Sequence, residues 1–211
     1  MMSVALATED VLSETIGQRL IDELGAQVQV TTLLRRTGNG YLRSKMRSWC
    51  QMARHQPVVV LTDLDRLACP KALLDDWFAQ LPRPANLMVR VAVRQSESWL
   101  LADHEAIRKL IGPRGALPPQ PDNLPNAKEH LLQLARLAPR EVRLDLIKAA
   151  GSISSQGIGY NARLADLIQA DWSPERAAQR SPSLERARRR MRELTVRLDN
   201  ETNALGIDVS E

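Results

Sequence analysis

Four short apolar segments alternate with segments of helical periodicity in the first half of the chain. Of all features of the sequence, this alternation places the strongest limit on the folds that the chain can adopt. The apolar segments are 4–7, 28–34, 58–61 and 87–93. Segment 58–61 is continuous and rich in valine, which is typical of a strand buried on both faces. Segment 87–93 is more polar on one side and suits an edge or half-covered strand.

Apolar residues recur at helical spacing in the intervening segments, which predicts a helix in each of 11–24, 41–53, 73–81 and 99–111. Strands that alternate with helices in this way favour a parallel sheet with helices on its faces. The sequence therefore predicts an α/β fold with a parallel sheet of about four strands.

The pattern changes after residue 111. Segment 112–125 contains five prolines and predicts a loop, and only helical patterns follow it. Asn126 and Glu129 are spaced as an N-cap and its partner at the start of the first of these helices. We expect an α/β domain over 1–111, a proline-rich loop over 112–125 and an all-helical extension over 126–211.

Composition excludes several classes of protein. Hydrophobic residues make up 44% of the 211 and charged residues 26%, which is typical of a globular chain rather than a disordered one. No apolar run approaches the roughly 18 residues of a membrane span, and the N-terminus lacks the positive flank of a signal peptide. The two cysteines suit free thiols in a reducing compartment, so we expect a cytoplasmic protein.

No Walker motif is present, so the chain is not itself a P-loop ATPase.

Carboxylates follow three of the four predicted strands. Glu9 follows the first, Asp63 and Asp65 follow the third, and Glu97 follows the fourth, with Asp103 six residues beyond it. The carboxyl ends of parallel strands meet at one sheet edge, where ligands bind. Hard oxygen ligands suit Mg²⁺ or Mn²⁺, and a pair of such ions about 4 Å apart activates water and stabilises a leaving oxygen. Acidic residues in these places also cap helices, which is the alternative interpretation.

Basic residues surround the glycine-containing turn at 38–40. The candidates for contacts with a nucleic-acid backbone are Arg35, Arg36, Arg43 and Lys45. A solvated polar loop is the alternative. Lys128 opens the helical extension and is a candidate for stabilising charge on a phosphate, or else an ordinary surface residue.

The final predicted helix is rich in arginine. Between residues 175 and 197 the chain carries eight arginines against three glutamates. Such a helix can cover a sheet edge, bind nucleic acid or dock on an acidic partner, and a solvated helix face is the default.

The phrases Val-Ala-Leu-Ala-Thr-Glu over 4–9 and Val-Val-Val-Leu-Thr-Asp-Leu-Asp over 58–65 resemble the TOPRIM motif of topoisomerases, primases and OLD-family nucleases. Asp10 stands where that motif usually has a glycine. The phrase Glu-Ser-Trp-Leu-Leu-Ala-Asp over 97–103, together with 181–187, resembles a family of small TOPRIM-like bacterial proteins of unknown function. That family is often encoded beside an AAA or ABC-type ATPase and looks like the effector half of anti-phage systems.

Two functions of different class follow as hypotheses. The first is a nuclease that needs Mg²⁺ or Mn²⁺, cleaves DNA or RNA and works with an ATPase partner. Its expected metal ligands are Glu9, Asp63, Asp65, Glu97 and Asp103, and its expected catalytic residues are Glu9, Asp63, Asp65, Glu97 and Lys128. The second is a non-catalytic interaction subunit with a vestigial acidic site. A phospho-acceptor domain and a glycosyltransferase-type Asp-x-Asp are further alternatives, and a homo-oligomer stays open.

Overall fold

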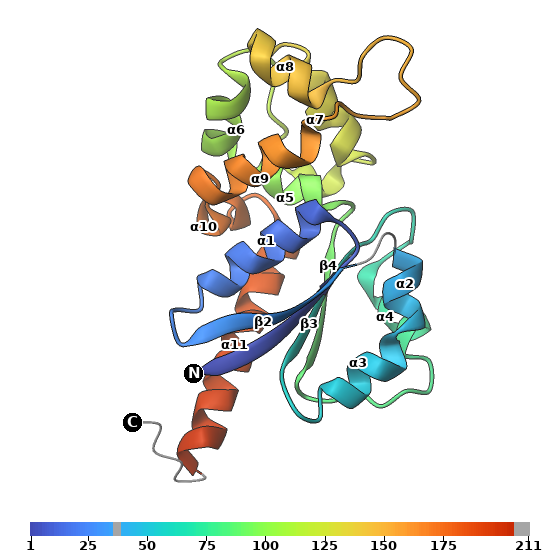
Figure 1. Ribbon diagram of the computed structural model, residues 1–211, viewed down its shortest axis with the longest axis vertical. Helices are drawn as coiled ribbons and strands as arrows, with labels where there is room; N and C mark the ends of the chain where they lie inside the picture. Colours follow the sequence, from blue (N-terminus) through green and yellow to red (C-terminus); the bar gives the residue numbers. More distant parts are fainter. Residues whose placement is uncertain (36–38, 205–211) are drawn as a thin grey trace.

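The computed structural model describes residues 1–35 and 39–204, and it is built around a four-stranded parallel sheet (Figure 1). The strands are β1 (Met2–Thr8), β2 (Val28–Arg35), β3 (Val58–Asp63) and β4 (Leu87–Ala92), in the spatial order β2-β1-β3-β4. The predicted α/β fold with a four-stranded parallel sheet is confirmed. β3 is central and buried almost throughout, whereas β4 is an edge strand, as the two sequence patterns indicated.

Helices cover both faces of the sheet (Figure 1). The bounds of the first six are α1 (Val11–Asp22), α2 (Asn39–Ser44), α3 (Met46–Met52), α4 (Pro70–Phe78), α5 (Ser96–Ala102) and α6 (His104–Ile111). One hydrophobic core forms where side chains of one sheet face pack against α1 and α5. A second hydrophobic core forms where the other face packs against α2, α3 and α4. Alternate residues of each strand contribute to the two cores because side chains alternate across a strand.

Two predicted helices are each divided in the structure. The predicted helix over 41–53 is α2 followed by α3, and the two helices are separated at Lys45. Near this junction, the Nε1–H of buried Trp49 donates a hydrogen bond to the carbonyl of Leu42. The predicted helix over 99–111 is α5 followed by α6, and they part at Asp103. The Asp103 carboxylate accepts a hydrogen bond from the backbone N–H of Ala106, so it caps a new helix instead of continuing the old one.

The C-terminal part is helical, as predicted. Its elements are the short 3₁₀ helix η1 (Pro121–Asn123), α7 (Ala127–Ala135), α8 (Arg140–Leu146), α9 (Tyr160–Ala170), α10 (Pro174–Ala178) and α11 (Pro182–Ala204). The predicted cap at Asn126 is confirmed, because its Oδ1 accepts a 2.9 Å hydrogen bond from the N–H of Glu129.

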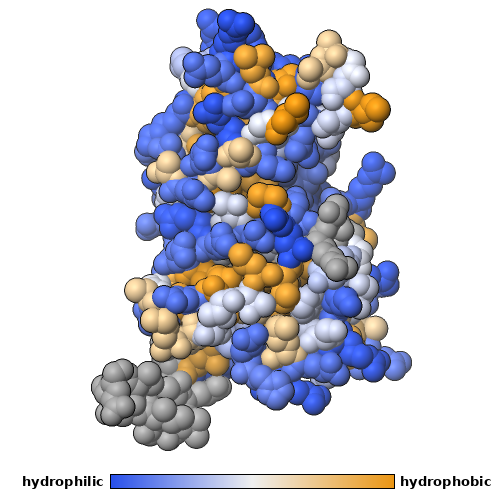
Figure 2. Space-filling view, viewed as in Figure 1, coloured by the Kyte–Doolittle hydropathy of each residue, from blue (hydrophilic) through white to orange (hydrophobic). Residues whose placement is uncertain are grey.

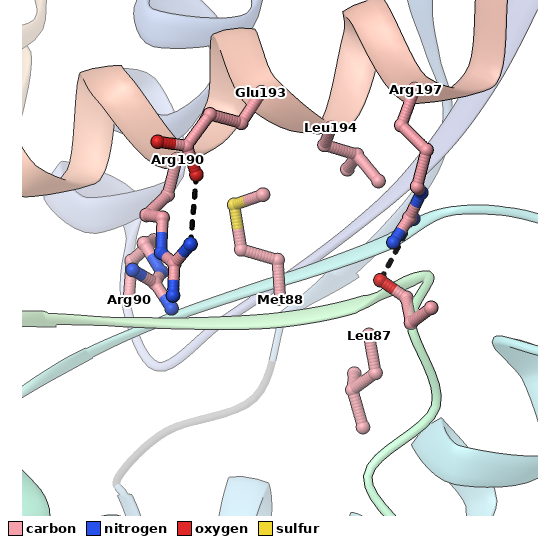
Figure 3. Close-up of a pocket in the computed structure, with 8 residues that line it drawn as sticks. Leu87, Met88, Arg90, Arg190, Glu193, Leu194 and Arg197 are labelled. Atoms are coloured by element: carbon pink, nitrogen blue, oxygen red, sulfur yellow. Dashed lines mark hydrogen bonds and ion pairs between the residues drawn. The ribbon is translucent and has the colours of Figure 1, made fainter. Parts of the chain in front are cut away.

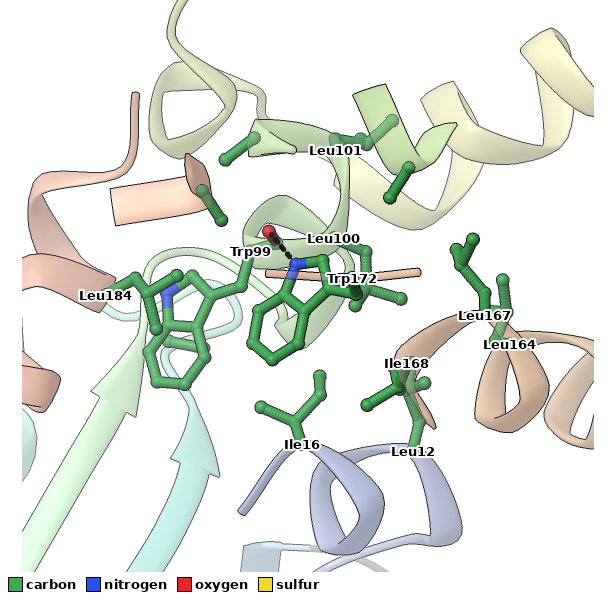
Figure 4. Packing of buried hydrophobic residues seen from close by; sticks show 14 of the residues in the cluster. Leu12, Ile16, Trp99, Leu100, Leu101, Leu164, Leu167, Ile168, Trp172 and Leu184 are labelled. Carbon is green, nitrogen blue, oxygen red and sulfur yellow. Dashed lines mark hydrogen bonds between the residues drawn. The ribbon is translucent and has the colours of Figure 1, made fainter. Parts of the chain in front are cut away.

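The C-terminal helices pack on the same core as the sheet. Trp172 stacks its indole among α5, α9 and α1, and its Nε1–H donates a 3.1 Å hydrogen bond to the carbonyl of Trp99 (Figure 4). Trp99 donates in turn to the hydroxyl of Ser183 at the start of α11, over 2.7 Å. These contacts fix α5, which carries Glu97, against Trp172 and the start of α11.

The visible face of the molecule is mainly hydrophilic (Figure 2). Leu144 on α8 and Ile153 and Ile158 in the loop after it are exposed apolar residues. Within the described ranges, no helix combines the length and the apolar character that crossing a bilayer requires.

Candidate functional site

Glu9 joins the ends of two neighbouring strands. It follows β1, and its Oε1 accepts a 2.8 Å hydrogen bond from the N–H of Asp63 and a 3.3 Å hydrogen bond from the hydroxyl of Thr62. Burial raises the pKa of Glu9, and the negative charges of Asp10 and Asp65 raise it further, against the lowering effect of the Asp63 N–H. Glu9 directly follows β1 and Asp63 is the last residue of β3, and because these strands pair in parallel the two carboxyl groups lie at one edge, as expected from the sequence.

Asp63 joins β3 to the start of α5. Its Oδ1 accepts hydrogen bonds from the backbone N–H of Ser96, at 2.9 Å, and from the Ser96 hydroxyl, at 2.6 Å. Its pKa lies well above the ordinary range, mainly because of burial and then because of the charges of Glu97 and Glu9. Three carboxyl groups thus crowd one small region and disfavour one another's ionised forms.

Glu97 is buried in the first turn of α5. Its Oε1 accepts a 2.8 Å hydrogen bond from the hydroxyl of Tyr160 on α9. Burial raises the pKa of Glu97, whereas the Tyr160 hydroxyl and the charge of Lys128 lower it. Burial, and then the charge of Glu97, raises the pKa of Tyr160, so the phenol keeps its proton. The phenol is therefore a donor that orients Glu97.

Lys128 lies beside this pair. Its Nζ is 5.0 Å from the centre of the Tyr160 ring, and its backbone N–H donates to Oε1 of Gln95, just before α5. The structure therefore brings Lys128 to the acidic cluster, as the hypothesis required. Tyr160 was missed: its sequence signal was only that of an apolar position at the start of a helix.

Asp65 and Asp10 border the cluster. Asp65 is exposed and has a φ of 51°, in the left-handed region that aspartate tolerates better than most residues, and its backbone N–H donates to the carbonyl of Arg94. Asp10 caps α1: its Oδ1 accepts from the N–H of Ser13 at 2.8 Å and from its hydroxyl at 2.7 Å. The capping interpretation thus describes Asp10, although its charge still acts on Glu9, Asp63 and Glu97.

Asp103 has a different environment. Its fully buried carboxylate pairs with the guanidinium of Arg176, at 3.0 Å from Nε and 2.8 Å from Nη2, and accepts a 2.8 Å hydrogen bond from the N–H of Ser173. Both oxygens are thereby used to join α6 to α10. We therefore leave Asp103 out of the candidate site and correct its expected role from metal ligand to helix cap and ion-pair partner.

The predicted basic residues lie around the end of β2. Arg35 is 3.5 Å from the carboxylate of Glu14, and Arg43 is 2.7 Å from that of Asp76. Lys45 is exposed at the junction of α2 and α3, and Arg36 lies outside the described residues. Arg35 and Arg43 are exposed enough to exchange these carboxylates for phosphates, because surface ion pairs are weak.

The chemistry open to this cluster follows from its charge. Glu9, Asp63 and Glu97 hold protons to a higher pH than ordinary carboxyl groups, which suits proton transfer, and their mutual repulsion would be relieved by a cation. Over the ranges 1–35 and 39–204, however, no three His, Cys, Asp or Glu side chains stand in a preformed metal-binding arrangement. A divalent ion would require the side chains to turn.

No protein-family model, curated protein or solved structure matches the chain. The TOPRIM resemblance therefore stays a prediction, and function has to be inferred from the side chains at the sheet edge.

Proposed function

We propose that the chain is a nuclease that uses Mg²⁺ or Mn²⁺ to hydrolyse phosphodiester bonds at the Glu9, Asp63 and Glu97 cluster. The observation that supports this most is that three carboxyl groups from three segments converge at the carboxyl edge of a parallel sheet, all with raised pKa values. Such convergence is costly to stability, since buried like charges repel, and it is most often retained for function.

The donor set fits a hard divalent cation. The hydrogen bonds of Glu9 and Asp63 engage Oε1 and Oδ1, and neither Oε2 of Glu9 nor Oδ2 of Asp63 accepts a hydrogen bond from a described residue. Glu9, Asp63, Asp65 and Glu97 would hold the ion, and the ion would supply Lewis-acid chemistry for the hydrolysis of the ester.

The chain's own residues have separable tasks in this proposal. Tyr160 orients Glu97, and Lys128 supplies positive charge for a phosphate oxygen at the rim of the cluster. Arg35, Arg36, Arg43 and Lys45 would hold the nucleic-acid backbone, so binding should weaken with salt. DNA and RNA both fit these contacts.

The effector role beside an ATPase rests on the sequence resemblance. One structural feature agrees with dependence on a partner: the carboxylates are tied to Thr62, Ser96 and Tyr160 rather than arranged for metal, so an activating contact could release them. The two free thiols, Cys50 and Cys69, agree with a cytoplasmic site.

A second candidate is a non-catalytic interaction subunit. The same feature favours it, because carboxylates that are satisfied within the protein can simply hold β1, β3 and α5 together. The two candidates differ in metal affinity: the interaction subunit should show no thermal shift with either ion.

The decisive experiment is cleavage by the purified chain. Supercoiled plasmid and total tRNA are incubated with Mn²⁺, Mg²⁺ or EDTA, beside Asp63→Ala, Asp65→Ala and the matched control Asp166→Ala, which removes an exposed carboxylate from α9. Cleavage that requires the ion and both cluster aspartates, and that survives in Asp166→Ala, supports the nuclease. Cleavage retained in both Asp63→Ala and Asp65→Ala would falsify it.

A further inference from the structure

A second candidate site lies between the edge strand β4 and helix α11. It is a pocket of about 400 Å³, a size that small-molecule sites commonly have (Figure 3). Its lining residues are Ala85, Leu87, Met88, Arg90, Arg190, Glu193, Leu194 and Arg197. Leu87 and Met88 belong to the amino end of β4 and Ala85 to the loop before it, whereas the carboxylate cluster gathers at the carboxyl ends of the strands. The pocket is therefore separate from the proposed nuclease site.

Arg90 is the unusual residue of this pocket. It projects from β4 beneath α11, and its buried Nε has no hydrogen-bond acceptor among the residues that the structure describes. Burial lowers its pKa to about 10, the charge of Arg190 contributes to this lowering, and Glu193 opposes it. A partly buried guanidinium whose Nε–H has no acceptor is unfavourable, and an anion in the pocket would relieve this cost.

The single carboxylate of the lining is already shared. Oε2 of Glu193 accepts a 2.8 Å hydrogen bond from Arg190, and Oε1 lies 3.7 Å from Nε of Arg189. Both arginines belong to α11. The pKa of Glu193 is lowered chiefly by the Arg190 hydrogen bond, so this carboxylate is ionised but committed to its own helix. The carboxylate of Glu193 therefore acts on Arg90 only through its charge and not through a hydrogen bond.

The remaining wall combines a fixed cation with apolar side chains. Nη2 of Arg197 donates to the carbonyl of Ala85 at 2.9 Å and to Oδ1 of Asn86 at 2.7 Å, which holds its guanidinium over the loop before β4. Met88 and Leu194 lie between Arg197 and the Arg90–Arg190 pair (Figure 3). The pocket therefore offers a cationic end and an apolar middle.

We propose that this pocket binds a small organic phosphate monoester, with its phosphate at Arg90 and Arg190 and its organic part against Met88 and Leu194. Guanidinium groups match the geometry of phosphate oxygens, and a monoester carries nearly two negative charges at neutral pH. That charge balances three arginines against one glutamate. The volume of the pocket exceeds that of a phosphate group, and Met88 and Leu194 line the remaining space.

Calorimetric titration of the full chain in EDTA tests the ligand class. The probes are adenosine 5′-monophosphate and glycerol 3-phosphate, each beside its unphosphorylated parent, adenosine or glycerol. Binding of at least one monoester without binding of its parent supports the proposal. Binding of neither monoester, or equal binding of monoester and parent, overturns it. Because no metal or cleavage is involved, failure here is independent of the nuclease proposal.

Two variants of α11 test the location. Arg190→Gln removes a mostly exposed cation from the pocket, so the fold should survive, and affinity should fall about tenfold or more, the effect expected for one lost charge-assisted hydrogen bond. Arg192→Gln is the matched control, because Arg192 is exposed on the same helix but lies near Leu20 and Glu23, beside α1. Equal weakening by both variants overturns the site in favour of diffuse attraction. So does an oligonucleotide that binds more tightly than both monoesters and loses its affinity in Arg190→Gln.

Discussion

The hydroxyl of Tyr160 donates a 2.8 Å hydrogen bond to Oε1 of Glu97, across 63 positions of the chain. This bond fastens the helical C-terminal part to the acidic edge of the sheet. Glu97 is almost fully buried, so a lost partner cannot be replaced freely by water. The bond therefore links the stability of the fold to the orientation of a candidate catalytic group.

Tyr160→Phe should destabilise the protein by about 1–3 kcal/mol, because it leaves a buried carboxyl group without its donor. It should also raise the pKa of Glu97 further, since the hydroxyl stabilises the ionised form. Urea denaturation of the wild type, Tyr160→Phe, Glu97→Gln and the double variant measures the coupling. A coupling energy near zero would show that the bond has no energetic role.

Stability should fall as pH rises above the ordinary carboxyl range, because Glu9, Asp63 and Glu97 all have raised pKa values in the folded protein. Between the unfolded and folded pKa values the native state binds more protons, so deprotonation favours unfolding. Asp63→Asn keeps an acceptor for Ser96 but removes one charge, and it should reduce this fall. The measurement is the free energy of unfolding from about pH 4 to pH 8 in EDTA. An identical pH slope in Asp63→Asn would contradict the cluster's repulsion.

Asp103→Ala should destabilise the protein by about 2–4 kcal/mol, because it removes the cap of α6 and the buried carboxylate that pairs with Arg176. The matched control is Asp75→Ala, which breaks an exposed pairing with Lys71 and Arg83 and should destabilise the protein much less, because exposed ion pairs are screened by water. Chemical denaturation compares the two. Asp103→Ala should also leave any Mn²⁺ affinity unchanged, whereas a loss of metal binding by a folded variant would restore Asp103 to the list of ligands.

Trp172→Ala should destabilise the whole chain by about 3–5 kcal/mol, since its indole is buried among α1, α5 and α9 and hydrogen-bonded to Trp99. Because the sheet and the C-terminal helices share that core, far-UV circular dichroism and tryptophan fluorescence should report one coincident urea transition. Two separated transitions would show that the helical part unfolds independently.

Local sequence patterns were enough to predict four parallel strands and the edge at which Glu9 and Asp63 meet. The apolar runs 4–7 and 58–61 are local signals, and a parallel arrangement brings their carboxyl ends together, so Glu9 and Asp63 could be paired from sequence alone. Asn126 was likewise recognised because a helix cap depends on residues three positions apart. Such features need only neighbouring residues or the common geometry of parallel strands.

The tertiary structure alone decided which distant side chains meet. Tyr160 approaches Glu97, Asp103 turns to Arg176 and Arg90 lies beneath Arg190 because of how α9, α10 and α11 pack on the sheet. Sequence periodicity indicates which face of a helix is buried, but not the segment against which it is buried. Whether a carboxylate is a metal ligand or an ion-pair partner depends on that segment, because only packing brings the guanidinium of Arg176 to Asp103 from 73 positions away.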